Sequence, residues 1–63
     1  MMAEQKFIEV ELSSKGRTLI NLDKLVEIQD EGERTALYVE GGKYVNQYYI
    51  NEKYDNFKRR LNP

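Results

Sequence analysis

The side chains that would support catalysis are few and lack the partners that catalysis needs. Ser13 and Ser14 would be nucleophiles only beside a general base, and the chain contains no His and no Cys. They stand next to Gly16, so we expect them to form a turn. Glu9 and Glu11 have the spacing of two carboxylates on one strand face, but they alternate with apolar residues. We therefore expect them to face solvent, whereas a general acid needs a buried carboxylate.

Two further patterns carry weak chemical signals. The run Gly41-Gly42-Lys43 lacks the spacing of a phosphate-binding loop and precedes no helix, so a hairpin turn explains it. Asp23, Asp30 and the glutamates that follow do not have the spacing of a calcium loop. We therefore predict a protein that is not an enzyme and that has no metal site and no cofactor.

The length of the chain sets the scale of the fold. Its 63 residues predict one domain over residues 1–63. A domain of this size has little stability in reserve, and without Cys or His it has no disulfide or common metal site to reinforce it. Self-association is the reinforcement that remains, so we expect a homo-oligomer.

The segment Met1 to Phe7 contains no apolar run of the kind found in signal peptides, and no later run is long enough to span a membrane. We therefore expect a cytoplasmic protein with no membrane contact. The net charge of −1 hides an asymmetry, because residues 1–42 have five basic and nine acidic residues and residues 43–63 have five basic and two acidic ones. An acidic front and a basic tail can steer a partner toward the protein or align two copies of it.

Alternating apolar residues predict most of the secondary structure. Residues 6–12 place Ile8, Val10 and Leu12 on one strand face, and Gly16 closes a turn to a second strand over residues 17–21. Asn21 to Leu25 predicts a tight single turn, because Asn and Asp side chains bond nearby backbone. Three more strands are expected over residues 26–29, 35–40 and 43–49. The loops between them are residues 30–33 and Gly41-Gly42, where a type I′ turn needs two positive φ angles.

The last segment changes to the period of a helix. Ile50, Tyr54, Phe57 and Leu61 form one apolar stripe, with Asn51 as the expected N-cap. Lys58, Arg59 and Arg60 suit the last turn of this helix, and Asn62-Pro63 is expected to end it. The sequence thus predicts an α+β fold, a small twisted antiparallel sheet of about five strands connected by hairpins, with one C-terminal helix.

Aromatic residues are more numerous than one short helix can cover. A contiguous aromatic patch on a sheet usually marks an interface. The interface candidates are Phe7, Tyr38, Tyr44, Tyr48 and Tyr49. The alternative is that the Tyr-rich strand stacks nucleic-acid bases while the basic patch Lys58, Arg59 and Arg60 contacts phosphates. The pI of about 5.4 and the acidic front argue against a polyanionic partner.

Three parts of the stretch from Thr18 to Leu61 form one pattern: residues 20–28 (Ile-Asn-Leu-Asp-Lys-Leu-Val-Glu-Ile), residues 41–45 (Gly-Gly-Lys-Tyr-Val) and Asn51. With this pattern the stretch resembles the flagellar small-protein family of the FlbD type, and similar small phage and bacterial proteins. It implies a motility-associated role and no catalytic residue. Leu25 to Pro63 is also similar to the opening part of LytTR domains, in which the DNA-contacting segments lie largely beyond this part.

The absence of a catalytic constellation, together with the surplus of aromatics, favours a protein that acts by binding. We expect a protein–protein interaction module that self-associates. Encoded by a phage or mobile element, it would act as a regulator or inhibitor of a host protein. The alternatives are a nucleic-acid-binding regulator and a motility-associated small protein.

Overall fold

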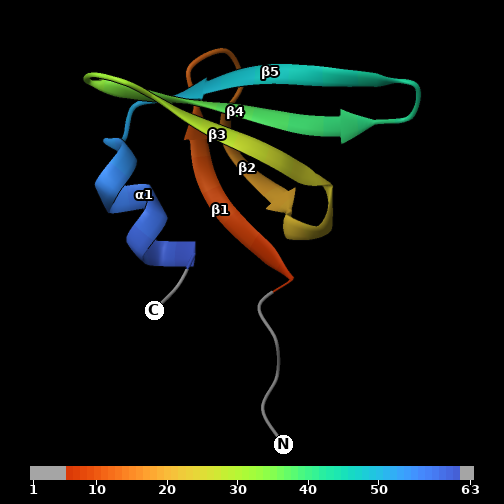
Figure 1. Cartoon of the computed structure of the whole chain (residues 1–63), viewed down its shortest axis with the longest axis horizontal. Helices are drawn as coiled ribbons and strands as arrows, with labels where there is room; N and C mark the ends of the chain where they lie inside the picture. Colours follow the sequence, from red (N-terminus) through yellow and green to blue (C-terminus); the bar gives the residue numbers. More distant parts are fainter. Residues whose placement is uncertain (1–5, 62–63) are drawn as a thin grey trace, which may run out of the picture.

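The computed structural model describes residues 6–61, which form a five-stranded antiparallel sheet and one C-terminal helix (Figure 1). This confirms the predicted α+β class. A single 3-10 turn, η1, connects the second and third strands. The elements in order are β1 (Phe7–Leu12), β2 (Gly16–Asn21), η1 (Leu22–Lys24), β3 (Leu25–Glu31), β4 (Arg34–Gly41), β5 (Tyr44–Ile50) and α1 (Tyr54–Leu61).

The hairpin of β1 and β2 follows directly from the sequence pattern. Ile8, Val10 and Leu12 are buried and the residues between them are exposed, as the alternation predicts. Gly16 has φ of +87°, a conformation that L residues rarely adopt, and it closes the turn where it was expected. The strand β2 ends at Asn21, whose side chain accepts a hydrogen bond of 2.9 Å from the backbone N–H of Asp23. This local bond starts η1 and confirms the predicted single turn.

The loop of the β3–β4 hairpin is shorter than the sequence predicted, and the loop of the β4–β5 hairpin is shifted by one residue. The strand β3 continues to Glu31, so the first loop is only Gly32-Glu33, with the Gly32 N–H donating to Asp30 Oδ1 at 3.0 Å. The second loop is Gly42-Lys43, because Gly41 still pairs with Tyr44. The prediction of a type I′ turn at Gly41-Gly42 is therefore wrong. Only the first residue of each loop, Gly32 and Gly42, has positive φ, which is the requirement of a type II′ turn.

The start of the helix also differs from the prediction. Ile50 is the last residue of β5, paired with both Leu12 and Thr35, and it is buried in the core. The helix begins at Tyr54, and the Lys53 carbonyl accepts its first hydrogen bond, from the Phe57 N–H at 3.0 Å. Asn51 is therefore not the N-cap. Ile50 and Phe57, two residues of the predicted apolar stripe, are nevertheless buried, although Ile50 belongs to a strand and not to the helix. The predicted end at Asn62-Pro63 lies outside the described residues.

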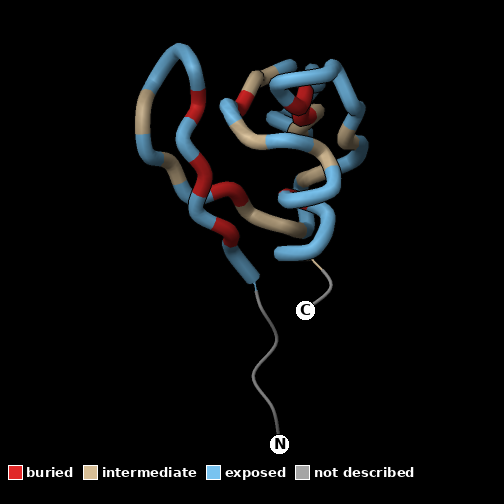
Figure 2. Tube along the Cα trace, turned by 90° about the vertical axis from the view of Figure 1, so that its left-hand side faces the viewer, coloured by how far each residue is buried: buried red, intermediate tan, exposed pale blue. Residues whose placement is uncertain are grey.

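The first and last strands are neighbours in the sheet, whose order is β2-β1-β5-β4-β3. They pair only at Leu12 and Ile50, with one more bond of 2.8 Å from the Ser13 N–H to the Tyr49 carbonyl. Beyond this corner the β1–β2 hairpin diverges from β5, and α1 descends beside it (Figure 1). The side view in Figure 2 shows this hairpin on one side and the rest of the chain on the other.

The core lies between the β1–β2 hairpin, the inner face of β3, β4 and β5, and the helix α1. Phe57 is the only fully buried residue of α1 and lies in one cluster with side chains from β1, β2, β4 and β5. Thr35, also fully buried, donates its hydroxyl to the Glu52 carbonyl at 2.7 Å and so fixes the segment that leads into the helix. The buried apolar cluster consists of Ile8, Val10, Leu12, Ile20, Leu37, Ile50 and Phe57.

Candidate functional site

The five aromatic interface candidates lie on different surfaces. Residues that pair directly across strands share a face. Tyr48 pairs with the buried Leu37, so Tyr48 and Tyr44, four residues apart on β5, point to the core side of the sheet. Tyr38 and Tyr49 point to the outer side. Phe7 lies on the outer face of β1, alternating with Ile8. The predicted single aromatic patch is therefore divided.

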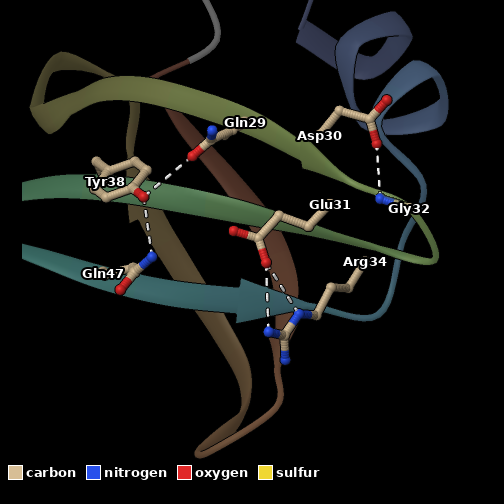
Figure 3. Close-up of polar contacts among 7 residues, drawn as sticks. All are labelled: Gln29, Asp30, Glu31, Gly32, Arg34, Tyr38 and Gln47. Carbon is tan, nitrogen blue, oxygen red and sulfur yellow. Dashed lines mark hydrogen bonds and ion pairs between the residues drawn. The ribbon is translucent and has the colours of Figure 1, made fainter.

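The outer face of β3, β4 and β5 holds a short chain of hydrogen bonds around Tyr38 (Figure 3). The Tyr38 hydroxyl donates to Gln29 Oε1 at 3.3 Å and accepts from Gln47 Nε2 at 2.9 Å. The three residues come from three adjacent strands. The bonds fasten the ring across the sheet and satisfy its hydroxyl as both donor and acceptor.

Tyr49, on the same face, is covered by a cation. The guanidinium carbon of Arg34 lies 3.7 Å from the centroid of the Tyr49 ring, and the same group forms an ion pair with Glu31 at 3.3 Å. Ala36, opposite Tyr49, has no exposed surface. The Arg34 plane therefore occupies the position that a stacked base would take, and this corner of the sheet stabilises the fold.

Tyr48 belongs in part to the core. It is half-buried and packs against the buried cluster, while Lys15 Nζ lies 5.3 Å from the centroid of its ring. A ring in this position loses little water when a partner binds. Among the five candidates, only Phe7 and Tyr44 have more than half of their surface exposed.

The basic patch of α1 is partly neutralised. Arg60 binds Glu52 through two hydrogen bonds, Nη2 to Oε1 at 2.9 Å and Nε to Oε2 at 3.0 Å. Arg59 donates to Asn56 Oδ1 at 3.2 Å, and Lys58 Nζ lies 5.8 Å from the Tyr54 ring. Within residues 6–61, Lys58 and Arg59 have no carboxylate partner. The helix and the β4–β5 loop lie at opposite ends of the molecule (Figure 1), so the basic patch and Tyr44 do not form one surface.

The end of the β4–β5 hairpin extends past the last pair of β3 with β4, Leu25–Val39, and we call residues 40–45 the arm (Figure 1). Every residue of the arm is exposed. Tyr44 is 74% exposed and its neighbour Val45 is 54% exposed, and they point to opposite faces of the hairpin. The ladder continues to the loop through the pairs Glu40–Val45 and Gly41–Tyr44. The arm therefore presents apolar side chains on both faces of a regular hairpin.

The structure also exposes apolar residues that the sequence analysis missed. Leu19 on β2 is 63% exposed, and Val26 on β3 is 56% exposed at an irregularity of the β3–β4 register between Leu25 and Glu27. A signal for Leu19 was present, because Leu19 and Ile20 are adjacent and only one of two adjacent strand residues can face the core. No such signal marks Val26, since the irregularity depends on the pairing with β4.

No family model, curated protein or solved structure matches this chain. The resemblances to the FlbD type and to LytTR domains therefore stay predictions.

Within residues 6–61, no three acidic side chains gather closely enough to hold a metal ion. In the same range no helix is long and apolar enough to cross a membrane. On the basis of exposed apolar side chains, the candidate functional site is the arm, together with the exposed apolar residues of the edge strands.

Proposed function

We propose that this chain is a non-enzymatic, self-associating protein-binding module whose contact surface for a partner is the arm. The observation that carries the proposal is the exposure of Tyr44, 74%, on a hairpin that extends beyond the core. Tyrosine is among the residues that contribute most to binding at protein interfaces, because it buries a large area at a small loss of side-chain entropy.

The backbone of the arm supports this role. The strands pair without interruption from Thr35–Ile50 to Gly41–Tyr44, and a two-residue loop connects them. Gly42 has φ of +74°, so the loop adopts its tight geometry without strain. A surface that is already ordered loses less conformational entropy on binding than a flexible loop does. The expected partner is a protein with an apolar pocket that accepts the Tyr44 ring.

A small binding module of this kind suits a regulator or inhibitor of a larger protein. The module would be encoded by a phage or mobile element and would act in the cytoplasm. The alternative of a nucleic-acid-binding regulator has less support. Arg34 covers Tyr49, Glu52 neutralises Arg60, and the rest of the basic patch lies far from Tyr44. A motility-associated role rests on the sequence resemblance alone.

The test uses two double variants of the tagged full chain in extract of the cells that encode it. The first is Tyr44→Thr with Val45→Thr, which keeps the strand propensity of the arm and removes its apolar surface. The matched control is Lys58→Ser with Arg59→Ser, which changes two exposed residues of α1. Circular dichroism confirms that both variants fold.

The expected result is a protein that the wild type and the helix variant capture in near-stoichiometric amount and that the arm variant does not capture. Equal capture by the arm variant would overturn the role of the arm. Loss of a nuclease-sensitive complex by the helix variant alone would favour the nucleic-acid alternative. Absence of any captured protein in all three would overturn the proposed partner binding.

A further inference from the structure

The strand β2 is an edge of the sheet, and its outer backbone groups have no partner strand within residues 6–61. The hydrogen bond of 2.9 Å from the Leu22 N–H to the Lys6 carbonyl shows that Lys6 and Leu22 form a hydrogen-bonded pair of the β1–β2 ladder. Because bonded and non-bonded pairs alternate in an antiparallel ladder, Ile20 bonds to β1 through its pair Ile8. The N–H and C=O groups of Arg17, Leu19 and Asn21 then point away from β1. This edge offers donors and acceptors to another strand.

The edge at β2 also lacks the features by which proteins protect edge strands. The other edge, β3, has a register irregularity beside Val26 and several acidic residues, including Glu27 and Glu31. Both features discourage the pairing of two copies. In contrast, β2 pairs with β1 without a bulge, contains no Pro, and has one charged residue, Arg17, already paired with Glu9 at 3.2 Å. Two copies can therefore approach along β2 without net repulsion.

An apolar surface lies directly beside this edge. Leu19 is 63% exposed and Phe7 is 52% exposed. They share the outer face of the hairpin, because Phe7 pairs with Asn21, two residues after Leu19. The edge therefore combines unpaired backbone groups with exposed apolar side chains, which is the combination that strand addition uses.

We propose that two copies of this chain pair antiparallel along β2, with Leu19 of one copy opposite Leu19 of the second copy. Antiparallel pairing about a two-fold axis must set the outward-pointing residues opposite one another. Arg17 opposite Arg17 would oppose like charges, and Arg17 opposite Leu19 would place each guanidinium against an aliphatic chain. Leu19 opposite Leu19 pairs the aliphatic chains and sets Arg17 opposite the neutral Asn21 of the second copy.

This inference deepens the self-association in the proposed function and rests on it, but it does not use the arm. The dimer forms one continuous sheet across the two copies and covers Leu19 on both. It also explains how a chain without disulfides gains stability, since folding and association are coupled in a small domain.

The first experiment measures the mass of the full chain over a range of concentrations by sedimentation equilibrium. The wild type is expected to double its monomer mass of 7.5 kDa. Leu19→Lys places two ammonium groups opposite each other and should weaken dimerisation by at least about tenfold. The matched control, Val26→Lys, adds the same charge at a similarly exposed apolar residue of the other edge and should still dimerise.

The second experiment tests the register through single cysteines, which the natural chain does not contain. In a hydrogen-bonded pair the Cα atoms are about 5.5 Å apart, which is within the range that a disulfide spans. Leu19→Cys should therefore crosslink two copies under mild oxidation. Arg17→Cys, whose copies would lie roughly 13 Å apart in this register, should not.

Each opposite outcome overturns the inference. A wild type that stays monomeric, a dimer that Leu19→Lys leaves intact, or a crosslink at residue 17 in place of residue 19 would each contradict it. A monomer that still captures a partner through the arm would leave partner binding standing. A dimer with the expected crosslink that captures no protein would retain the inference and overturn the partner-binding role.

Discussion

Substitution of Phe57 tests whether the helix completes the core. Phe57 is the one residue of α1 with no exposed surface, and it lies in the same cluster as Leu37 and Ile50. Phe57→Ala would remove most of this contact and leave a cavity between the helix and the sheet. Phe57→Leu would remove less volume and keep an apolar side chain.

The expected loss is large relative to the stability of the protein. A buried Phe→Ala change lowers the free energy of unfolding by about 3–5 kcal/mol. For 63 residues, the usual stability per residue gives a total of roughly 3–9 kcal/mol. The Ala variant is therefore expected to be largely unfolded or close to it. Phe57→Leu, which removes fewer buried carbons, should lose roughly 1–2 kcal/mol and remain measurable.

Urea unfolding followed by far-UV circular dichroism gives the free energies, provided that protein concentration is held constant. Lys58→Ala, at the exposed next residue of the same helix, is the control and should stay within about 0.5 kcal/mol of wild type. Unchanged midpoints for both Phe57 variants would show that the helix does not pack on the sheet. In that case the reasoning about the core would be refuted.

Three further substitutions have defined outcomes. Thr35→Val removes the hydroxyl that donates to the Glu52 carbonyl at 2.7 Å and should lower the free energy of unfolding by about 1–2 kcal/mol, while equal urea midpoints would show that the bond contributes nothing. Gly42→Ala, where no atom lies within 4 Å of the added carbon, should cost about 1–2 kcal/mol through the positive φ alone; an unchanged melting temperature would contradict this. Glu52→Gln weakens the partly exposed ion pair with Arg60 and should cost about 1 kcal/mol, a difference that should shrink at about 1 M salt.

Local patterns in the sequence determined most of the elements. The alternation over residues 6–12 identified the first strand and the residues it buries, and Gly16 identified the turn after it. Asn21 began a single turn because its side chain bonds to the backbone two residues later. These features depend on neighbours in the chain, so the sequence alone suffices to find them. The exposed Tyr44 was likewise among the predicted interface residues.

The tertiary structure decided the features that depend on residues far apart in the sequence. The spacing of Ile50, Tyr54 and Phe57 fits a helix, yet Ile50 ends a strand because it pairs with Leu12 and Thr35 from two other strands. The cross-strand partners of the tyrosines depend on the register of β4 with β5. The observed loop Gly42-Lys43 pairs Tyr48 with Leu37, whereas a loop at Gly41-Gly42 would pair it with Thr35. Moving a two-residue loop by one residue shifts the register of the hairpin by two residues, which keeps the faces of the strands and changes the cross-strand partners. A prediction of the loop within one residue therefore leaves these partners undetermined. The pairing of β1 with β5 makes β2 an edge strand, and Leu19 is exposed on that strand beside unpaired backbone groups. Because β1 and β5 are far apart in the sequence, no local pattern encodes this pairing.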